Sequence, residues 1–277
     1  MNAVENKFEK MGARVKIETI ETPKAKRKFG SRWKRIVTPG TSPADFVRLD
    51  VRKDKDGAFF DVRTGINVDL EVLDVKPKER HLLLMARTSD GKSKFLCGHD
   101  ERDWFVAAIP ESSSASNVAT AMESLKPTSV IEAEKSVKVK SCKKHKHKNE
   151  ARVRQGEWFF IPCHNLKVDK KMILENEPLR RGRSKPHMAE FLYRTGGTTV
   201  WVSSKYPNGL TKSQYEKLSV DERKKGMFRV MTRNAKVYVK GKIRHPDHKT
   251  VELNEWCEVE LNNEGLSKAM RSVAFLD

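Results

Sequence analysis

The chain has 277 residues, with 56 lysines and arginines against 37 acidic residues, which gives a formal net charge of +19. This length allows two cores of ordinary size. The 34% of charged residues against 37% hydrophobic ones predicts that long stretches remain in water. No apolar run is long enough to span a bilayer, and the first residues lack the apolar core of a secretory signal. We therefore expect an intracellular protein of the cytoplasm, nucleoid or nucleus, rather than a secreted or membrane-spanning one.

Residues 1–45 carry roughly six more positive than negative charges and show little apolar periodicity, which predicts a flexible basic arm. Within this arm, Arg32, Trp33, Lys34 and Arg35 place an aromatic ring among cations. Such a composition suits phosphate contacts together with stacking on a base. The alternative is a solvated tail whose Trp33 packs on the next module.

Residues 46–110 predict a first, antiparallel β module. Apolar and polar residues alternate along 46–52 and 58–63, and Asp56-Gly57 between them supplies the turn of a hairpin. Four further strands are expected at 66–72, 82–86, 93–97 and 104–109. Because no helical pattern interrupts them, we expect a small barrel-like module.

Residues 111–155 differ from both of their neighbours in composition. A serine-rich stretch is followed by a lysine-rich one, and the net charge between Ala133 and Gln155 is about +7. A short helix fits residues 119–125, but few residues of this segment are able to form a core. The segment is therefore predicted to be a disordered, basic linker.

Residues 156–265 predict a second β-rich module, followed by a C-terminal tail at 266–277 with a short terminal helix. Ser184 with Pro186 favours a helix over 184–194, and Ser219 with Glu222 has the spacing of a capping box before a helix that ends at Gly226. Strands are expected at 158–162, 171–174, 198–203, 227–232, 236–244, 250–253 and 256–261. The whole chain is thus predicted to be α+β and mainly β, with two short helices in the second module.

Two basic groups in the second module are candidates for binding nucleic acid. Tyr238, Lys240, Lys242 and Arg244 occupy alternate positions of one predicted strand, so they share a face that can follow a phosphate backbone. The loop residues Arg180, Arg181 and Arg183 add guanidinium groups suited to phosphate. The alternative is that both groups are ordinary solvated surface.

His245, Asp247 and His248 lie within one predicted turn and form a candidate metal or acid–base site. A zinc site needs three or four ligands, so His187, Cys163, His164 or Cys257 would have to complete it. A divalent metal is therefore a possible cofactor. The alternative is a purely structural hairpin turn.

The four cysteines show no C-x-x-C spacing, which predicts free thiols rather than disulfides or a zinc ribbon. Cys97 with His99 has the residue types of a cysteine nucleophile. The sequence contains no phosphate-binding loop, no dinucleotide fingerprint, no zincin or serine-hydrolase motif and no DNA-reading motif.

Nucleic acid is the expected partner of so basic a chain. The favoured hypothesis is a non-catalytic or accessory nucleic-acid-binding protein of low sequence selectivity. Two alternatives remain open. One is a nucleic-acid-processing enzyme with its site around His245, Asp247 and His248, and the other is a structural or assembly protein with basic arms.

Overall fold

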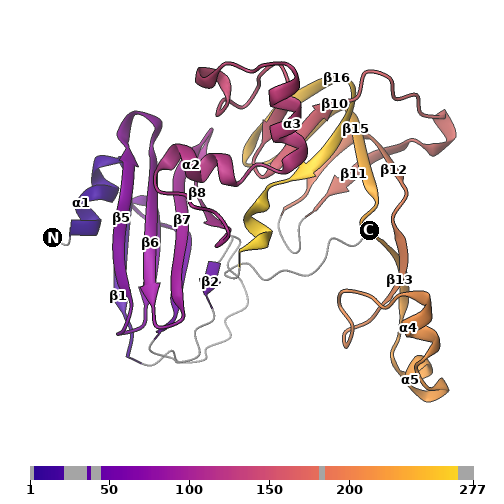
Figure 1. Cartoon of the computed structure of the whole chain (residues 1–277), viewed down its shortest axis with the longest axis horizontal. Coiled ribbons are helices and arrows are strands. Elements are labelled where there is room, and N and C mark those ends of the chain that lie inside the picture. Colours follow the sequence, from indigo (N-terminus) through magenta and orange to yellow (C-terminus); the bar gives the residue numbers. More distant parts are fainter. Residues whose placement is uncertain (1–2, 22–35, 39–44, 181–184, 268–277) are drawn as a thin grey trace. The chain divides into compact units, whose positions relative to one another are not determined.

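The computed structural model describes residues 3–21, 36–38, 45–180 and 185–267, and it gives the side-chain environment of all of these except 36–38 (Figure 1). The described residues form two compact units, the first within 3–158 together with 261–267 and the second within 159–260. Both units are built mainly from strands, as expected. In the described part of the chain, every helix is too short or too polar to cross a membrane.

The first unit contains two four-stranded sheets with the orders β1-β4-β3-β2 and β5-β6-β7-β8. All six strands predicted in residues 46–110 are confirmed: β3 (Val47–Asp54), β4 (Gly57–Thr64), β5 (Asp69–Lys76), β6 (His81–Thr88), β7 (Gly91–Asp100) and β8 (Asp103–Ile109). A short 3-10 helix, η2 (Pro77–Glu79), connects β5 to β6. The strands β1 (Arg14–Thr19) and β2 (Ile36–Thr38) come from the expected basic arm, and β1 runs parallel to β4.

One apolar core lies between these two sheets. Leu49 and Phe60 from the first sheet and Leu82 and Phe95 from the second are all fully buried in it. Two separate sheets packed face to face account for this burial, so the predicted barrel-like closure is not confirmed.

The start of the expected basic arm contributes to the same core. Helix α1 (Ala3–Lys10) places Val4 and Phe8 on one face, because residues four apart lie one turn apart. The ring of Phe8 is fully buried and lies 5.1 Å from the ring of Phe60. Residues 3–19 are therefore helix and strand rather than a flexible tail.

The expected linker, residues 111–155, contains two helices, α2 (Val118–Ser124) and α3 (Thr128–Ser136). Figure 1 shows α2 lying across the sheet of β5–β8. Val118 and Ala121 of α2 pack against Leu83 and Ile109 on the outer face of that sheet. The Asn117 side chain caps α2 by accepting a hydrogen bond from the Thr120 amide at 2.9 Å. The predicted flexible linker is therefore not confirmed.

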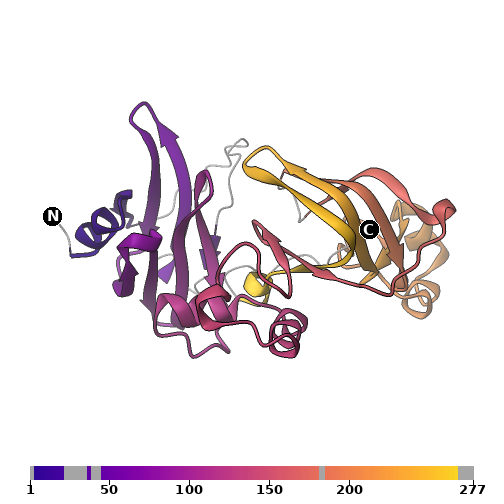
Figure 2. The ribbon, with the colours of Figure 1, turned by 90° about the horizontal axis from the view of Figure 1, so that it is seen from above.

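The second unit is organised around a sheet with the order β11-β12-β15-β16-β10-β9, whose last strand precedes the unit boundary at residue 158. The long β15–β16 hairpin is the yellow and orange ribbon of Figure 2. Two strands predicted at 250–253 and 256–261 form the single strand β16. The elements are β9 (Val153–Gln155), β10 (Trp158–Pro162), η4 (Lys170–Met172), β11 (Leu174–Leu179), β12 (His187–Thr195), β15 (Lys236–His245), β16 (His248–Leu261) and η5 (Asn263–Leu266).

The helix predicted over 184–194 is wrong, because residues 187–195 form strand β12. Strand β12 pairs with β11 on one side and β15 on the other, with a register shift between Ala189 and Phe191. His187 and Ala189 point into the unit and Met188 lies between them, which is the period of a strand. Proline before the segment and glycines after it are compatible with the ends of a strand as well as with those of a helix. Pairing with the neighbouring strands therefore determines that the segment is a strand.

A small lobe, residues 198–233, is inserted in the chain between the neighbouring strands β12 and β15 (Figure 1). It consists of the two-stranded sheet β13 (Thr198–Val202) with β14 (Arg229–Arg233) and the helices α4 (Lys212–Glu216) and α5 (Val220–Lys225). The predicted capping box of Ser219 and Glu222 is confirmed, whereas α4 was not expected. Stacked rings hold the lobe together, with Trp201 and Tyr215 5.1 Å apart.

Candidate nucleic-acid interface

The row Tyr238, Lys240, Lys242 and Arg244 lies on β15, with the expected alternation. Val237, Val239 and Ile243 are buried, while the row itself is half-exposed or exposed. Acidic and amide groups accompany it, however: Lys236 pairs with Glu258 at 2.8 Å, and the Arg244 guanidinium donates to Asn176 at 2.7 Å.

Glu190 and Glu252 add further negative charge beside Lys242. Glu252 is its register partner on β16, and the Glu190 carboxylate accepts the Lys242 amide hydrogen bond at 2.8 Å. Gly241, at φ +82°, leaves room for that carboxylate, because a Cβ there would lie 2.6 Å from its oxygen. The face is therefore a mixture of charges rather than a continuous row of cations.

The other predicted contacts lie at the edge of the described residues or beyond it. Arg180 follows β11 and is exposed. The remaining ones, Arg32, Trp33, Lys34, Arg35, Arg181 and Arg183, fall outside the described residues. In sequence, residues 22–35 contain seven lysines and arginines and no acidic residue.

The strongest described concentration of positive charge is residues 135–148, which we call the lysine segment. It contains seven lysines and no acidic residue. It runs from the end of α3 through the 3-10 helix η3 (Ser141–Lys143) to a bridge between Lys148 and Val153. Within the described part of the chain, only one of these seven lysines, Lys143, has a carboxylate oxygen within 4.0 Å of its ammonium nitrogen, and that carboxylate belongs to Glu150.

Arg152 fixes the path of the lysine segment from inside. Its guanidinium donates to the carbonyl oxygens of Lys144 and Lys146, each at 2.7 Å. The side chain is 1% exposed, and its charge is balanced by Glu134 at 3.1 Å. These bonds attach the backbone of the lysine segment to Arg152 at Lys144 and Lys146. Lys138, Lys140, Lys146 and Lys148 are exposed to solvent.

Glu134 is the buried acidic centre beneath the segment. It accepts hydrogen bonds from Lys126 at 2.6 Å and from Asn149 at 2.9 Å, in addition to the bond from Arg152. Burial by itself raises the pKa of the Glu134 carboxyl, but these hydrogen bonds and the neighbouring cations outweigh burial and lower that pKa below its ordinary value.

Replacing Glu134 with glutamine is expected to make stability less sensitive to acid. Since the native state holds the Glu134 pKa low, its stabilising effect is complete above the pKa of the unfolded chain and is lost as pH falls through the folded value. Denaturant unfolding at about pH 6 and about pH 3.5 should therefore show a larger loss of unfolding free energy in the wild type than in Glu134→Gln. Equal losses would contradict the assignment.

The lysine segment contains two histidines, and one of them, His147, contacts an acidic residue of β7. His147 lies 2.8 Å from the Asp100 carboxylate, which also accepts a hydrogen bond from Arg154 at 3.1 Å. The half-buried His145 has its pKa lowered, first by burial and then by the charge of Lys126.

The lobe is a second basic region with aromatic side chains. Residues 198–233 contain eight lysines and arginines against three acidic residues. The Lys205 ammonium lies 5.4 Å from the Tyr206 ring centroid, and Arg223 lies 5.8 Å from that of Tyr215. Sequence reasoning did not select these residues, although their composition resembles the selected one around Trp33.

The predicted turn around His245 and His248 lies between β15 and β16, and the structure adds His187 from the start of β12. The three imidazoles place ligand nitrogens within 4.8 Å of one another. Asp247 does not join them, because both of its carboxylate oxygens bond to the Lys185 ammonium, Oδ2 at 2.5 Å. Cys163, His164 and Cys257 are likewise not members of this cluster.

The four cysteines are free thiols, as expected. Cys97 is fully buried in β7, and burial raises its thiol pKa far above the ordinary value. Burial also raises the pKa of Cys257 to about 12. Since the thiolate is the nucleophile, a catalytic role for Cys97 with His99 has no support.

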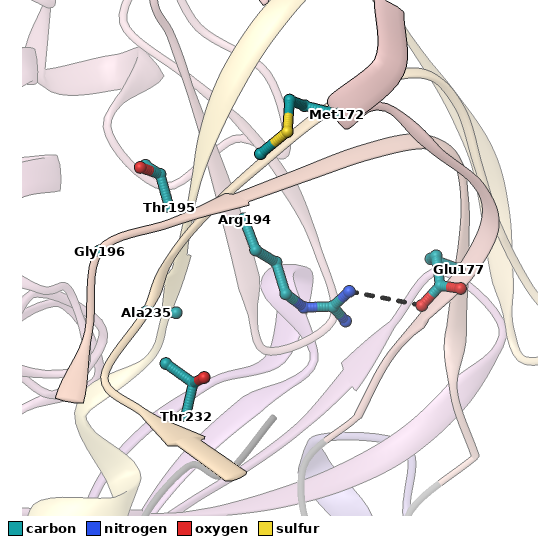
Figure 3. A pocket seen from close by; sticks show the side chains of 7 residues that line it. All are labelled: Met172, Glu177, Arg194, Thr195, Gly196, Thr232 and Ala235. Carbon is teal, nitrogen blue, oxygen red and sulfur yellow. Dashed lines mark hydrogen bonds and ion pairs between the residues drawn. The ribbon is translucent and has the colours of Figure 1, made fainter. Parts of the chain in front are cut away.

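A cavity of about 610 Å³ lies at the base of the lobe (Figure 3). Arg194 points across it toward Glu177, with 3.4 Å between Nη1 and the carboxylate. Its remaining lining is Met172, Thr195, Gly196, Thr232 and Ala235. This lining combines one ion pair with two hydroxyl groups.

Comparison with models of protein families, with curated proteins and with solved structures yields no match to this chain.

Proposed function

We propose that the protein binds nucleic acid with low sequence selectivity. Among the residues that the structure describes, the lysine segment is its principal contact surface. The observation that carries this proposal is a run of seven lysines without an acidic residue, held by the buried Arg152. A polycation fixed in one conformation loses less conformational entropy on binding than a flexible one.

The wider charge distribution supports the same partner. Residues 22–35 and the lobe add positive charge, whereas residues 45–110 are nearly neutral, with 12 lysines and arginines against 13 acidic residues. Positive charge is thus concentrated in separate segments. Such clustering favours a polyanion with regularly spaced charges, which releases condensed counterions when it binds.

Low selectivity follows from the residue types. Lysine ammonium groups act as point charges and suit phosphates, whereas reading of bases relies on planar bidentate groups aimed at base edges. The half-exposed rings of the lobe, such as Tyr206, add the possibility of stacking on unpaired bases. We therefore propose an accessory, non-catalytic binding role.

The test is a titration of the full chain with generic single- and double-stranded DNA and RNA at several salt concentrations. We expect the logarithm of the binding constant to fall linearly with the logarithm of salt, by about 0.9 per duplex phosphate contact. Oligonucleotides of different sequence should bind alike. An affinity that does not change with salt would contradict the proposal, and product formation in the same mixtures would favour the enzymatic alternative.

A further inference from the structure

We propose that His187, His245 and His248 form a binding site for one divalent transition-metal ion of the Zn²⁺ class. This site is separate from the lysine segment and does not depend on the proposed function. Two elements far apart in sequence supply it, the start of β12 and the β15–β16 turn. An ion there would link the turn to the neighbouring strand.

The spacing of the three rings is close to what a tetrahedral ion requires. With Zn–N distances of about 2.0–2.1 Å, two ligand nitrogens of a tetrahedral site lie about 3.3 Å apart, and the present ones all lie within 4.8 Å. The ring centroid of His187 lies 4.1 Å from that of His245 and 5.5 Å from that of His248. To reach the tetrahedral separation, the ligand nitrogens have to move toward one another by about 1.5 Å at most.

The rings of His187 and His245 are stacked, with 18° between their planes. Nitrogen lone pairs lie in the ring plane, so at least one ring has to turn for the three to converge on an ion. His245 also accepts the Asp247 amide hydrogen bond at Nδ1, 3.1 Å away. An ion that binds Nδ1 of His245 replaces this hydrogen bond, and an ion that binds Nε2 requires the other tautomer of the ring. Either change costs free energy, so the site is expected to bind metal more weakly than a preorganised one.

The donor set decides the chemical class. Three neutral imidazoles suit Zn²⁺, Cu²⁺, Ni²⁺ or Co²⁺ and disfavour Mg²⁺ and Ca²⁺, which prefer oxygen ligands. His187 is 2% exposed, whereas His245 and His248 are half-exposed, so an ion can enter from the side of the turn. Three protein ligands leave one tetrahedral position for water.

The experiment titrates the chelator-treated full chain with ZnCl₂ by calorimetry and with CoCl₂ by visible absorption. We expect one ion per chain, tetrahedral Co²⁺ bands without a thiolate charge-transfer band, and a melting temperature that rises with Zn²⁺. Mg²⁺ should not compete. Binding should weaken at mildly acidic pH, because a protonated imidazole cannot coordinate.

Variants assign the ligands. His248→Ala and His245→Ala should each weaken Zn²⁺ binding at least tenfold, while His164→Ala, an exposed histidine of the same unit, serves as the matched control and should bind like the wild type. Both turn variants are to be checked for a cooperative melt without metal. Unchanged Zn²⁺ binding in both would overturn the proposal, as would a thiolate band or the absence of a one-to-one complex in the wild type.

Discussion

Replacing Arg152 with alanine should lower the free energy of unfolding by about 3–5 kcal/mol, the range for breaking a buried ion pair. The change leaves the Glu134 carboxylate, 3% exposed, without one of its two cationic partners. It also leaves carbonyl groups of the lysine segment without their donor. Denaturant unfolding followed by circular dichroism measures the effect, and amide hydrogen exchange should become faster across residues 140–149.

Two comparisons separate this buried network from general effects of charge. Lys135→Ala, which removes an exposed cation of the same segment, should change the unfolding free energy by no more than about 0.5 kcal/mol. The double variant Arg152→Met with Glu134→Leu removes both charges together. Its loss of unfolding free energy should be smaller than the sum of the losses in the single variants Arg152→Met and Glu134→Leu. A loss below 1 kcal/mol for Arg152→Ala would mean that the segment is not anchored in this way.

The strands within residues 46–110 were predictable because they show either apolar alternation, as in β3, or a short continuous apolar run, as in β6. Val47, Leu49 and Val51 face one core. The turn of the hairpin is Lys55–Asp56, and Gly57 begins β4 with the positive φ of +109° that the predicted Asp-Gly pair supplies. Strand β12 lacked such local information. Its flanking proline and glycines fit both a helix and a strand. Pairing with the preceding strand β11 and with the more distant strand β15 determined the outcome.

The order of residues 111–155 could not be predicted from composition. Lysine-rich stretches usually remain solvated, but this one is organised by Arg152 and Glu134, which are 18 residues apart. Burial of such a pair depends on where α3 lies, which the sequence does not state. The sequence allowed a short helix at 119–125, which is α2, but it did not reveal the packing of Val118, Ala121 and Leu125 against the sheet.

The candidate metal ligands were predictable only in part. His245 and His248 were selected because they share a turn, and that turn is present. Asp247 was chosen for the same reason, but Lys185 binds its carboxylate. His187 was one of several possible completing ligands, and only the pairing of β12 with β15 brings it to the cluster.

Replacing four lysines of the lysine segment with glutamine should weaken binding to a generic duplex by about 10- to 1000-fold at 0.1 M salt. The reason is that each lost phosphate contact lowers the number of counterions released on binding by up to about one. The changed residues are Lys138, Lys140, Lys146 and Lys148, which are all exposed. The salt slope should flatten by up to about 3.6 for four lost contacts. Fluorescence anisotropy at several salt concentrations measures both quantities.

The matched control changes the net charge by the same amount within the same unit. Lys55, Lys76, Lys78 and Lys92 are exposed lysines on strands and turns of residues 45–110, where acidic residues balance the basic ones. Their replacement with glutamine should weaken binding only through the overall field, which salt screens within about 10 Å at 0.1 M. Equal losses in the two variants would show that total charge, and not the anchored lysine segment, governs binding. A selective loss in the segment variant, with an unchanged melting temperature, would assign the phosphate contacts to the segment that Arg152 holds in place.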